Sequence, residues 1–220
     1  MSRSALLVLA DGRFPAGGHA HSGGVEAAVR AGRVTGPADL AAFCRGRLHT
    51  AGLTSAALAA SAALGHDPSA LDAAADARTP SPALRAASRR LGRQLMRAAR
   101  TVWPDPGLDA LAAAFPRGAH QPLVLGTAAR AAALGADDAA HCAVYESVGG
   151  AATAAVRLLS LDPFQATAVL ARLAPEMDAV AAAAVDAAAR GPDALPARSA
   201  PLLDITAEDH AAWPVRLFAS

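Results

Sequence analysis

VYESVGGAATAAVRLL, residues 144–159, is the stretch that decides the fold class. Its apolar side chains recur at steps of three and four residues, the spacing of one helix face, at Val144, Val148, Ala152, Ala155 and Leu159. Each of the two adjacent glycines in the middle costs about 1 kcal/mol relative to alanine in a helix interior. We therefore expect a buried helix whose glycines let a neighbouring backbone approach closely.

The same helical periodicity runs through the rest of the chain. Helices are expected over 25–32, 37–65 (one long helix or two consecutive ones), 67–77, 82–102 with Ser81 as cap, 108–115, 122–134, 137–159, 162–173 and 175–190. No alternating strand pattern, β-branched run or hairpin signal is found. The sequence predicts an all-α fold, a single-domain bundle of about eight to ten helices.

This organisation gives a helical domain over residues 1–200 and a C-terminal tail over 201–220. The helical domain contains a Gly/Pro-rich loop at 11–24 that leads into a helix, and the stretch 191–204 is expected to be a linker.

Composition excludes several function classes. The 220 residues are 53% hydrophobic and carry a formal net charge of +1, which gives no general attraction to nucleic acid or an anionic membrane. All basic residues are arginine, so a P-loop lysine and a Schiff-base lysine are excluded. Cys44 and Cys142 stand alone and are expected to be buried free thiols. The first apolar run is too short for a convincing signal peptide, so a cytoplasmic location is expected.

GGHAHSGG, residues 17–24, invites a catalytic interpretation. Ser22 stands in a variant of the G-x-S-x-G nucleophile motif, and Asp204 and His210 follow in the order of a hydrolase triad. That motif requires a strand before the serine, and the preceding residues DGRFPAGGH cannot form a buried strand.

Metal binding is a second interpretation of the same loop. His19 and His21 could share an ion, but two ligands make an incomplete site. The plainer alternative is a tight turn in which Ser22 caps the next helix. A small metal-binding or hydrolytic protein that uses His19, His21 and Ser22 therefore remains an alternative function, as does a generic helical interaction protein.

Two surfaces are candidates for partner binding. Arginines at four-residue spacing occupy one face of the expected helix 82–102, as a solvated face or a docking face for an acidic protein: Arg85, Arg89, Arg93 and Arg97. The tail is rich in large apolar residues that should not stay in water, so it either folds onto its own core or docks on a partner. We favour docking, with candidate residues Trp213, Arg216, Leu217 and Phe218. Deleting residues 206–220 is then expected to leave the helical domain folded and to weaken assembly.

LADGRFPAGGHAHSGGVEAAVRAG, residues 9–32, resembles the N-terminal signature of the urease accessory protein F family. The matching positions are Asp11, Phe14, Pro15, Gly17, Gly18, His21, Ser22, Gly23 and Glu26. The resemblance continues in order through SRRLGRQLM, HQPLVLGTAARAAALGA, VYESVGGAATAAVRLLSLDP and PLLDITAEDHAAWPVRLFAS. His19 departs from the family, which usually has an aromatic residue there.

The resemblance implies a helical, non-enzymatic scaffold that dimerises. Members of the family join accessory protein D (also called H) and recruit the nickel-carrying GTPase, accessory protein G, to apo-urease. It implies that no cofactor is bound stably and that the assembled complex handles nickel. Within the signature it points to Phe14, Pro15, His21, Ser22 and Glu26 as partner-binding candidates.

Overall fold

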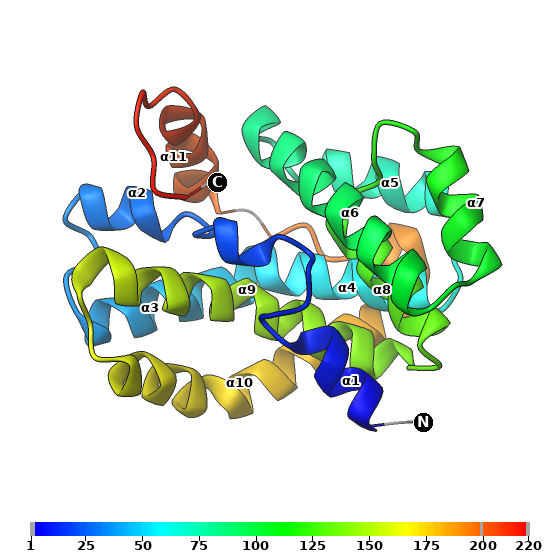
Figure 1. Ribbon diagram of the computed structural model, residues 1–220, viewed down its shortest axis with the longest axis horizontal. Coiled ribbons are helices and arrows are strands. Elements are labelled where there is room, and N and C mark those ends of the chain that lie inside the picture. Colours follow the sequence, from blue (N-terminus) through cyan, green and yellow to red (C-terminus); the bar gives the residue numbers. More distant parts are fainter. Residues whose placement is uncertain (1–2, 199, 219–220) are drawn as a thin grey trace.

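The computed structural model describes residues 3–198 and 200–218, and it confirms the all-α single-domain bundle (Figure 1). The α-helices of this part of the chain are α1 (Arg3–Ala10), α2 (Val25–Arg30), α3 (Pro37–Arg47), α4 (Leu53–Ala63), α5 (Pro68–Ala77), α6 (Pro82–Val102), α7 (Pro106–Ala114), α8 (Gln121–Ala131), α9 (Ala136–Leu159), α10 (Pro163–Ala189) and α11 (Pro201–Ala211). Three short helical turns join them: η1 (Gly18–Ala20), the π-helical η2 (Leu48–Gly52) and η3 (Pro192–Ala194).

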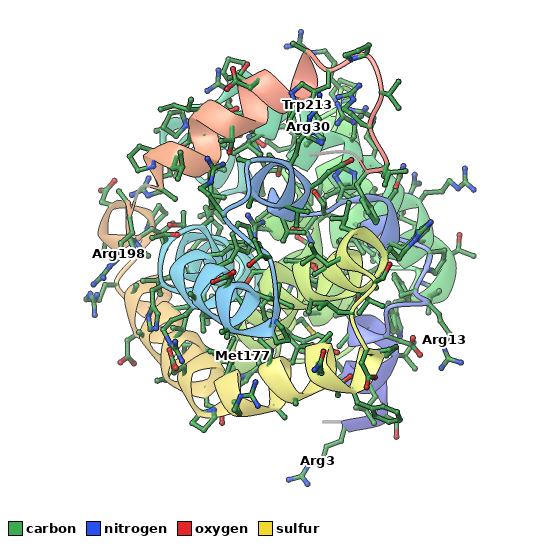
Figure 2. The ribbon with its side chains drawn as sticks, turned by 90° about the vertical axis from the view of Figure 1, so that its left-hand side faces the viewer. Arg3, Arg13, Arg30, Met177, Arg198 and Trp213 are labelled. Atoms are coloured by element: carbon green, nitrogen blue, oxygen red, sulfur yellow. The ribbon has the colours of Figure 1, made fainter. Side chains whose placement is uncertain are left out.

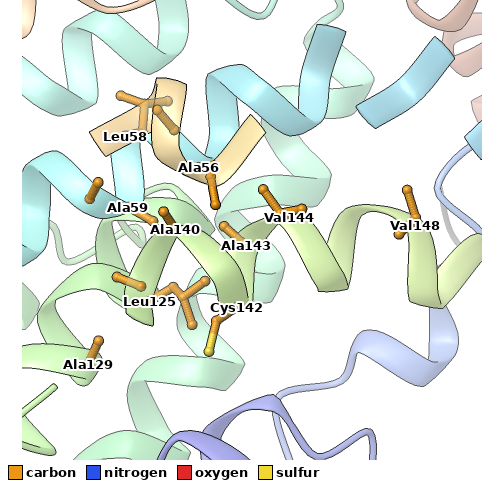
Figure 3. Packing of buried hydrophobic residues seen from close by; sticks show 14 of the residues in the cluster. Ala56, Leu58, Ala59, Leu125, Ala129, Ala140, Cys142, Ala143, Val144 and Val148 are labelled. Atoms are coloured by element: carbon orange, nitrogen blue, oxygen red, sulfur yellow. The ribbon is translucent and has the colours of Figure 1, made fainter. Parts of the chain in front are cut away.

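Helix α9 lies at the centre of the bundle. It contacts α10, α4 and α8 most extensively and also touches α1, α2 and α3 (Figure 1). Val144 and Val148 are fully buried, which confirms the apolar stripe expected from the sequence. Figure 3 shows small side chains of α4, such as Ala56, facing Ala140 and Ala143 of α9. A core built from alanine lets these helices approach closely.

Neighbouring backbone approaches two helical glycines closely, and neither is among those expected. A Cβ on Gly126 of α8 would lie 2.0 Å from the carbonyl oxygen of Ala59, and one on Gly92 of α6 would lie 2.1 Å from that of Ala119. By contrast, a Cβ on Gly150 would meet nothing closer than 3.6 Å, and Gly149 is equally unconfined. The expected close approach at the glycine pair of α9 is therefore wrong, because α9 meets its neighbours through its alanine stripe.

Several helices start as the sequence indicates. Asp67, Asp105 and Asp162 each precede a proline, and each side chain accepts a backbone hydrogen bond from the first turn of α5, α7 or α10. The Ser81 hydroxyl accepts a hydrogen bond from the Leu84 amide at 3.1 Å, which confirms the expected cap of α6. The buried thiols Cys44 and Cys142 are also confirmed.

Three boundaries differ from expectation. Helix α10 continues through Pro175, where two helices were expected, because residues on both sides of the proline are buried in the core, including Leu173 and Met177. Tertiary packing there outweighs the missing amide hydrogen bond. Helix α1 was not expected, and α11 begins inside the expected linker.

None of the described helices is both long and apolar enough to cross a bilayer.

Candidate functional site

A pocket of about 390 Å³ lies between the N-terminal loop and α9. Its walls come from many parts of the chain: the end of α1 and the loop that follows it (Leu9 to Gly23), the middle of α9, Arg47 at the end of α3, single residues of η2, α4, α6 and α8, and Phe218 near the C-terminus. The size is at the lower end of the range for small-molecule sites, and most of the wall is apolar. It gathers residues that are distant in the sequence, which makes it a candidate site.

Glu146 of α9 is the carboxyl group in the pocket wall whose ionisation is most altered. Burial raises its pKa to about 7, and a hydrogen bond from the Gln121 side-chain amide, at 2.6 Å, opposes this rise. Near neutral pH the group therefore exists in both protonation states.

Replacing Glu146 with glutamine is expected to make stability less sensitive to alkaline pH. A carboxyl whose folded pKa is raised contributes its full stability below the unfolded value near 4.5 and loses it as pH rises through about 7. Glu146→Gln should therefore unfold like the parent at pH 4.5 and be more stable at pH 8, by about 2 kcal/mol after allowance for solvent in the pocket. Urea denaturation at both pH values measures this, and an equal stability change at both would contradict it.

The two loop histidines, His19 and His21, line this pocket but do not form a complete metal site. His19 is exposed, and His21 is half-buried with a pKa lowered to about 4 by burial and by the nearby Arg90 and His19. Within the described residues, neither belongs to a cluster of three or more histidine, cysteine or carboxylate ligands.

One such cluster does occur in the described residues, at Asp72, Asp76 and His120. Both carboxylates already bind the guanidinium of Arg89, at 2.8 Å and 2.9 Å, and His120 binds Asp76 at 2.8 Å. Arg89 thus supplies one positive charge to the two carboxylates, and the Nε of Arg85 lies 3.9 Å from Asp76. The arrangement is a network of ion pairs that links α5, α6 and the start of α8.

Ser22 does not have the surroundings of a nucleophile. Its side chain is fully buried, and its hydroxyl has no hydrogen-bond partner in the described structure, so no base is placed to take its proton. His210, the base of the hydrolytic alternative, binds Glu26 instead, at 2.9 Å. The expected capping role is also wrong, because α2 is capped by the backbone of Gly24, which has a positive φ of 91°.

The remaining signature residues are largely used inside the chain. Phe14 is buried and stacks on Trp103, with ring centroids 5.6 Å apart, while Pro15 is exposed. Glu26 is buried and accepts hydrogen bonds from the C-terminal segment. A partner contact through Phe14, Ser22 or Glu26 would require these side chains to be uncovered, and such contacts stay predictions.

The arginine row on α6 divides into two pairs. Arg89 is tied to Asp72 and Asp76, and Arg85 donates to the carbonyl of Thr79 at 2.7 Å. Arg93 and Arg97 are exposed, and Arg93 donates to the Arg117 carbonyl at 2.7 Å. Arg93 and Arg97 are therefore accessible to an acidic partner, and their binding to one stays a prediction.

The C-terminal segment lies against its own chain. Helix α11 packs on α6 and α2 (Figure 1), and its Glu208 carboxylate accepts hydrogen bonds from the Ser81 hydroxyl and the Ala83 amide. Figure 2 shows Trp213 beside Arg30, whose guanidinium lies 4.1 Å from the ring centroid. Phe218 is buried, while Arg216 and Leu217 are exposed. Docking by this segment stays a prediction, restricted to its outer face.

The sequence reasoning missed Glu146, Gln121 and Arg47. Each stands in an ordinary helical stretch, and only the packing of α3, α8 and α9 brings them to one pocket. One signal was available in the sequence: Glu146 is a charged residue within the apolar run of α9, three residues before Gly149.

Comparison with known proteins identifies the family. The UreF family model matches residues 34–174, about two thirds of the chain. The chain belongs to the UreF family. It is 46% identical to the urease accessory protein UreF of Mycolicibacterium vanbaalenii, over 100% of this chain and 99% of the relative. It is 43% identical to UreF of Mycobacterium tuberculosis, over 95% of this chain and 94% of the relative.

Membership confirms the resemblance seen in the sequence, and the matched region includes the arginine row, the buried stripe of α9 and Glu146. The UreF relatives are named as accessory proteins, which favours a supporting role for this chain over catalysis. The Gly/Pro-rich loop precedes the region matched by the family model.

Proposed function

We propose that this UreF-family chain is a non-enzymatic scaffold in urease maturation. In this proposal it joins UreD (also called UreH) and UreG, regulates the GTPase UreG, and with them delivers nickel to apo-urease. It acts in the cytoplasm as a homodimer and holds no cofactor stably, so that nickel is handled by the assembled complex.

The observation that carries the proposal is the full-length similarity to proteins named urease accessory protein UreF. The geometry supports it in one further respect. The hydroxyl of the serine in the glycine-rich loop is hydrogen-bonded to no base in the described structure, and the histidines of that loop lack a third ligand among the described residues, so neither observation supports the alternative function.

The test is urease activation in cells that carry the urease genes with or without this chain. We expect its removal to abolish urease activity while apo-urease accumulates, and we expect the purified chain to bring down UreD/UreH and UreG. Unchanged nickel loading of urease in the absence of the chain would contradict the proposal.

The outer face of the C-terminal segment provides a sharper test of partner binding. Ile205 and Leu217 are 60% and 72% exposed, although α11 itself is fixed to α6. Because apolar side chains at the centre of an interface dominate its energy, Ile205→Asp and Leu217→Asp should each weaken UreD/UreH binding at least about tenfold. The melting temperature should not change, since neither side chain is in the core.

Leu64→Asp is the matched control, because Leu64 is 49% exposed at the end of α4. These substitutions replace the deletion of residues 206–220, which would cut through α11 and remove core contacts of His210 and Phe218. Full UreD/UreH binding by both C-terminal variants would show that this face is not the docking surface.

A further inference from the structure

Arg47 is a cation without a carboxylate partner in the pocket wall. Its Nε donates to the Ser147 carbonyl at 2.7 Å, and no ion pair of Arg47 occurs in the described residues. Burial lowers its pKa, and no neighbouring carboxylate opposes that effect. Arg47 is half-buried, and a guanidinium partly withdrawn from water is stabilised when an anion binds it; its two terminal nitrogens remain available for one.

The local backbone holds Arg47 in this position. It is the last residue of α3, and the π-helical turn η2 follows at once. A Cβ on Gly52 would lie 2.8 Å from the Ser147 hydroxyl, so η2 and α9 are in close contact here. π-Helical turns are rare and often occur at functional sites. The Nε bond fixes the plane of the guanidinium, which leaves the terminal nitrogens as a preformed fork.

The other charges around the pocket do not neutralise Arg47. The Asp11 carboxylate is already bound to Arg13 at 2.7 Å, and this pairing lowers its pKa to about 2. Glu146 is partly protonated near neutral pH, so it carries less than a full negative charge. Arg157 adds a second positive charge at the rim, above the ring of Phe218. The balance in the pocket is therefore positive.

The remaining wall determines what kind of anion fits. Leu9, Phe14, Leu91, Ala143 and Phe218 give the pocket an apolar lining beside the guanidinium. A phosphate has no apolar part, and all of its oxygens need polar partners, so it is poorly matched to an apolar cavity with a single fixed fork. A planar carboxylate accepts two parallel hydrogen bonds from one guanidinium, and an apolar body attached to it would displace water from the lining.

We propose that this pocket is a binding site for a small organic carboxylate with an apolar body, whose carboxylate pairs with Arg47. This site is separate from the proposed scaffold role and does not depend on it. The carboxylate lies in the plane of the guanidinium, and the apolar body occupies the space between the N-terminal loop and α9.

The test is calorimetric titration of the full-length protein at pH 6.5 and low ionic strength with benzoate, benzamide and inorganic phosphate. We expect saturable binding of benzoate and at least about tenfold weaker binding of its neutral isostere benzamide and of phosphate. Arg47→Gln should weaken benzoate binding at least about tenfold, and Arg172→Gln, on the exposed face of α10, should leave it unchanged.

A second variant tests the site independently, in case Arg47→Gln does not fold. Gly150 lines the pocket and is helical, and a Cβ there would make only an ordinary contact, 3.6 Å from the His21 carbonyl oxygen, so Gly150→Leu should fill the pocket without disturbing Arg47. We expect it to keep the parental melting temperature and to lose benzoate binding. The proposal is overturned if benzoate does not bind saturably, if benzamide or phosphate binds equally well, or if benzoate binding survives Gly150→Leu.

Discussion

Gly126→Ala is expected to destabilise the protein by about 2–3 kcal/mol, although alanine is the better helix former. The added methyl group would lie 2.0 Å from the carbonyl oxygen of Ala59 and 2.8 Å from the Cβ of Ala62. Both obstacles belong to α4 and cannot rotate away, so α8 and α4 must separate. Because these helices meet in the fully buried core, the separation opens space around several alanines at once.

The measurement is urea denaturation followed by circular dichroism. Gly150→Ala is the matched control, because a Cβ there lies in ordinary contact, 3.6 Å from the His21 carbonyl oxygen. The control should be as stable as the parent or more stable by up to about 1 kcal/mol. Equal stability of the two variants would contradict the prediction that α8 and α4 are too close at Gly126 to admit a methyl group.

Glu26→Ala is expected to release the C-terminal segment and to lower the free energy of unfolding by about 3 kcal/mol. Glu26 is 7% exposed, and its carboxylate accepts hydrogen bonds from His210 Nε2 and from the amides of Leu217 and Phe218, at 2.9, 2.8 and 3.0 Å. Without it, a buried histidine and two amides lose their acceptor, which is more damaging than the loss of an exposed ion pair.

Hydrogen exchange distinguishes this loss from general destabilisation. The amides of residues 206–218 should exchange much faster in Glu26→Ala, while those of α9 change only with global stability. Glu176→Ala, which removes a surface carboxylate bound to Arg45 and His49, is the control and should change neither measurement. Unaltered protection of the C-terminal amides in Glu26→Ala would refute the anchoring role.

Acid should weaken the same anchor in the parent protein. Burial alone would raise the pKa of Glu26, but the hydrogen bonds from Leu217, His210 and Phe218 together lower it. A carboxyl whose folded pKa is lowered stabilises the fold above its unfolded pKa and loses that effect as pH falls through the folded value. The C-terminal amides should therefore lose protection in acid before those of α9 do.

The sequence by itself determined the fold class, most helix starts and the family. Spacings of three and four residues identify helix faces without knowledge of the partner face, as at Val144 and Val148. Caps act within one turn, so Ser81 could be recognised as the start of α6 from local residues alone. The signature from Asp11 to Glu26 pointed to the family for the same reason, since it is a contiguous pattern.

Tertiary structure alone decided which glycines lie against a backbone, where the C-terminal segment goes, and which polar residues share a pocket. Gly126 and Gly150 are both helical glycines, and only the packing of α8 on α4 distinguishes them. Glu26 and Phe218 are 192 positions apart, and Arg47 and Ser147 are 100 apart. Helical periodicity specifies which residues turn inward, but it does not specify the helix or segment that they meet, because that depends on the simultaneous packing of the whole chain.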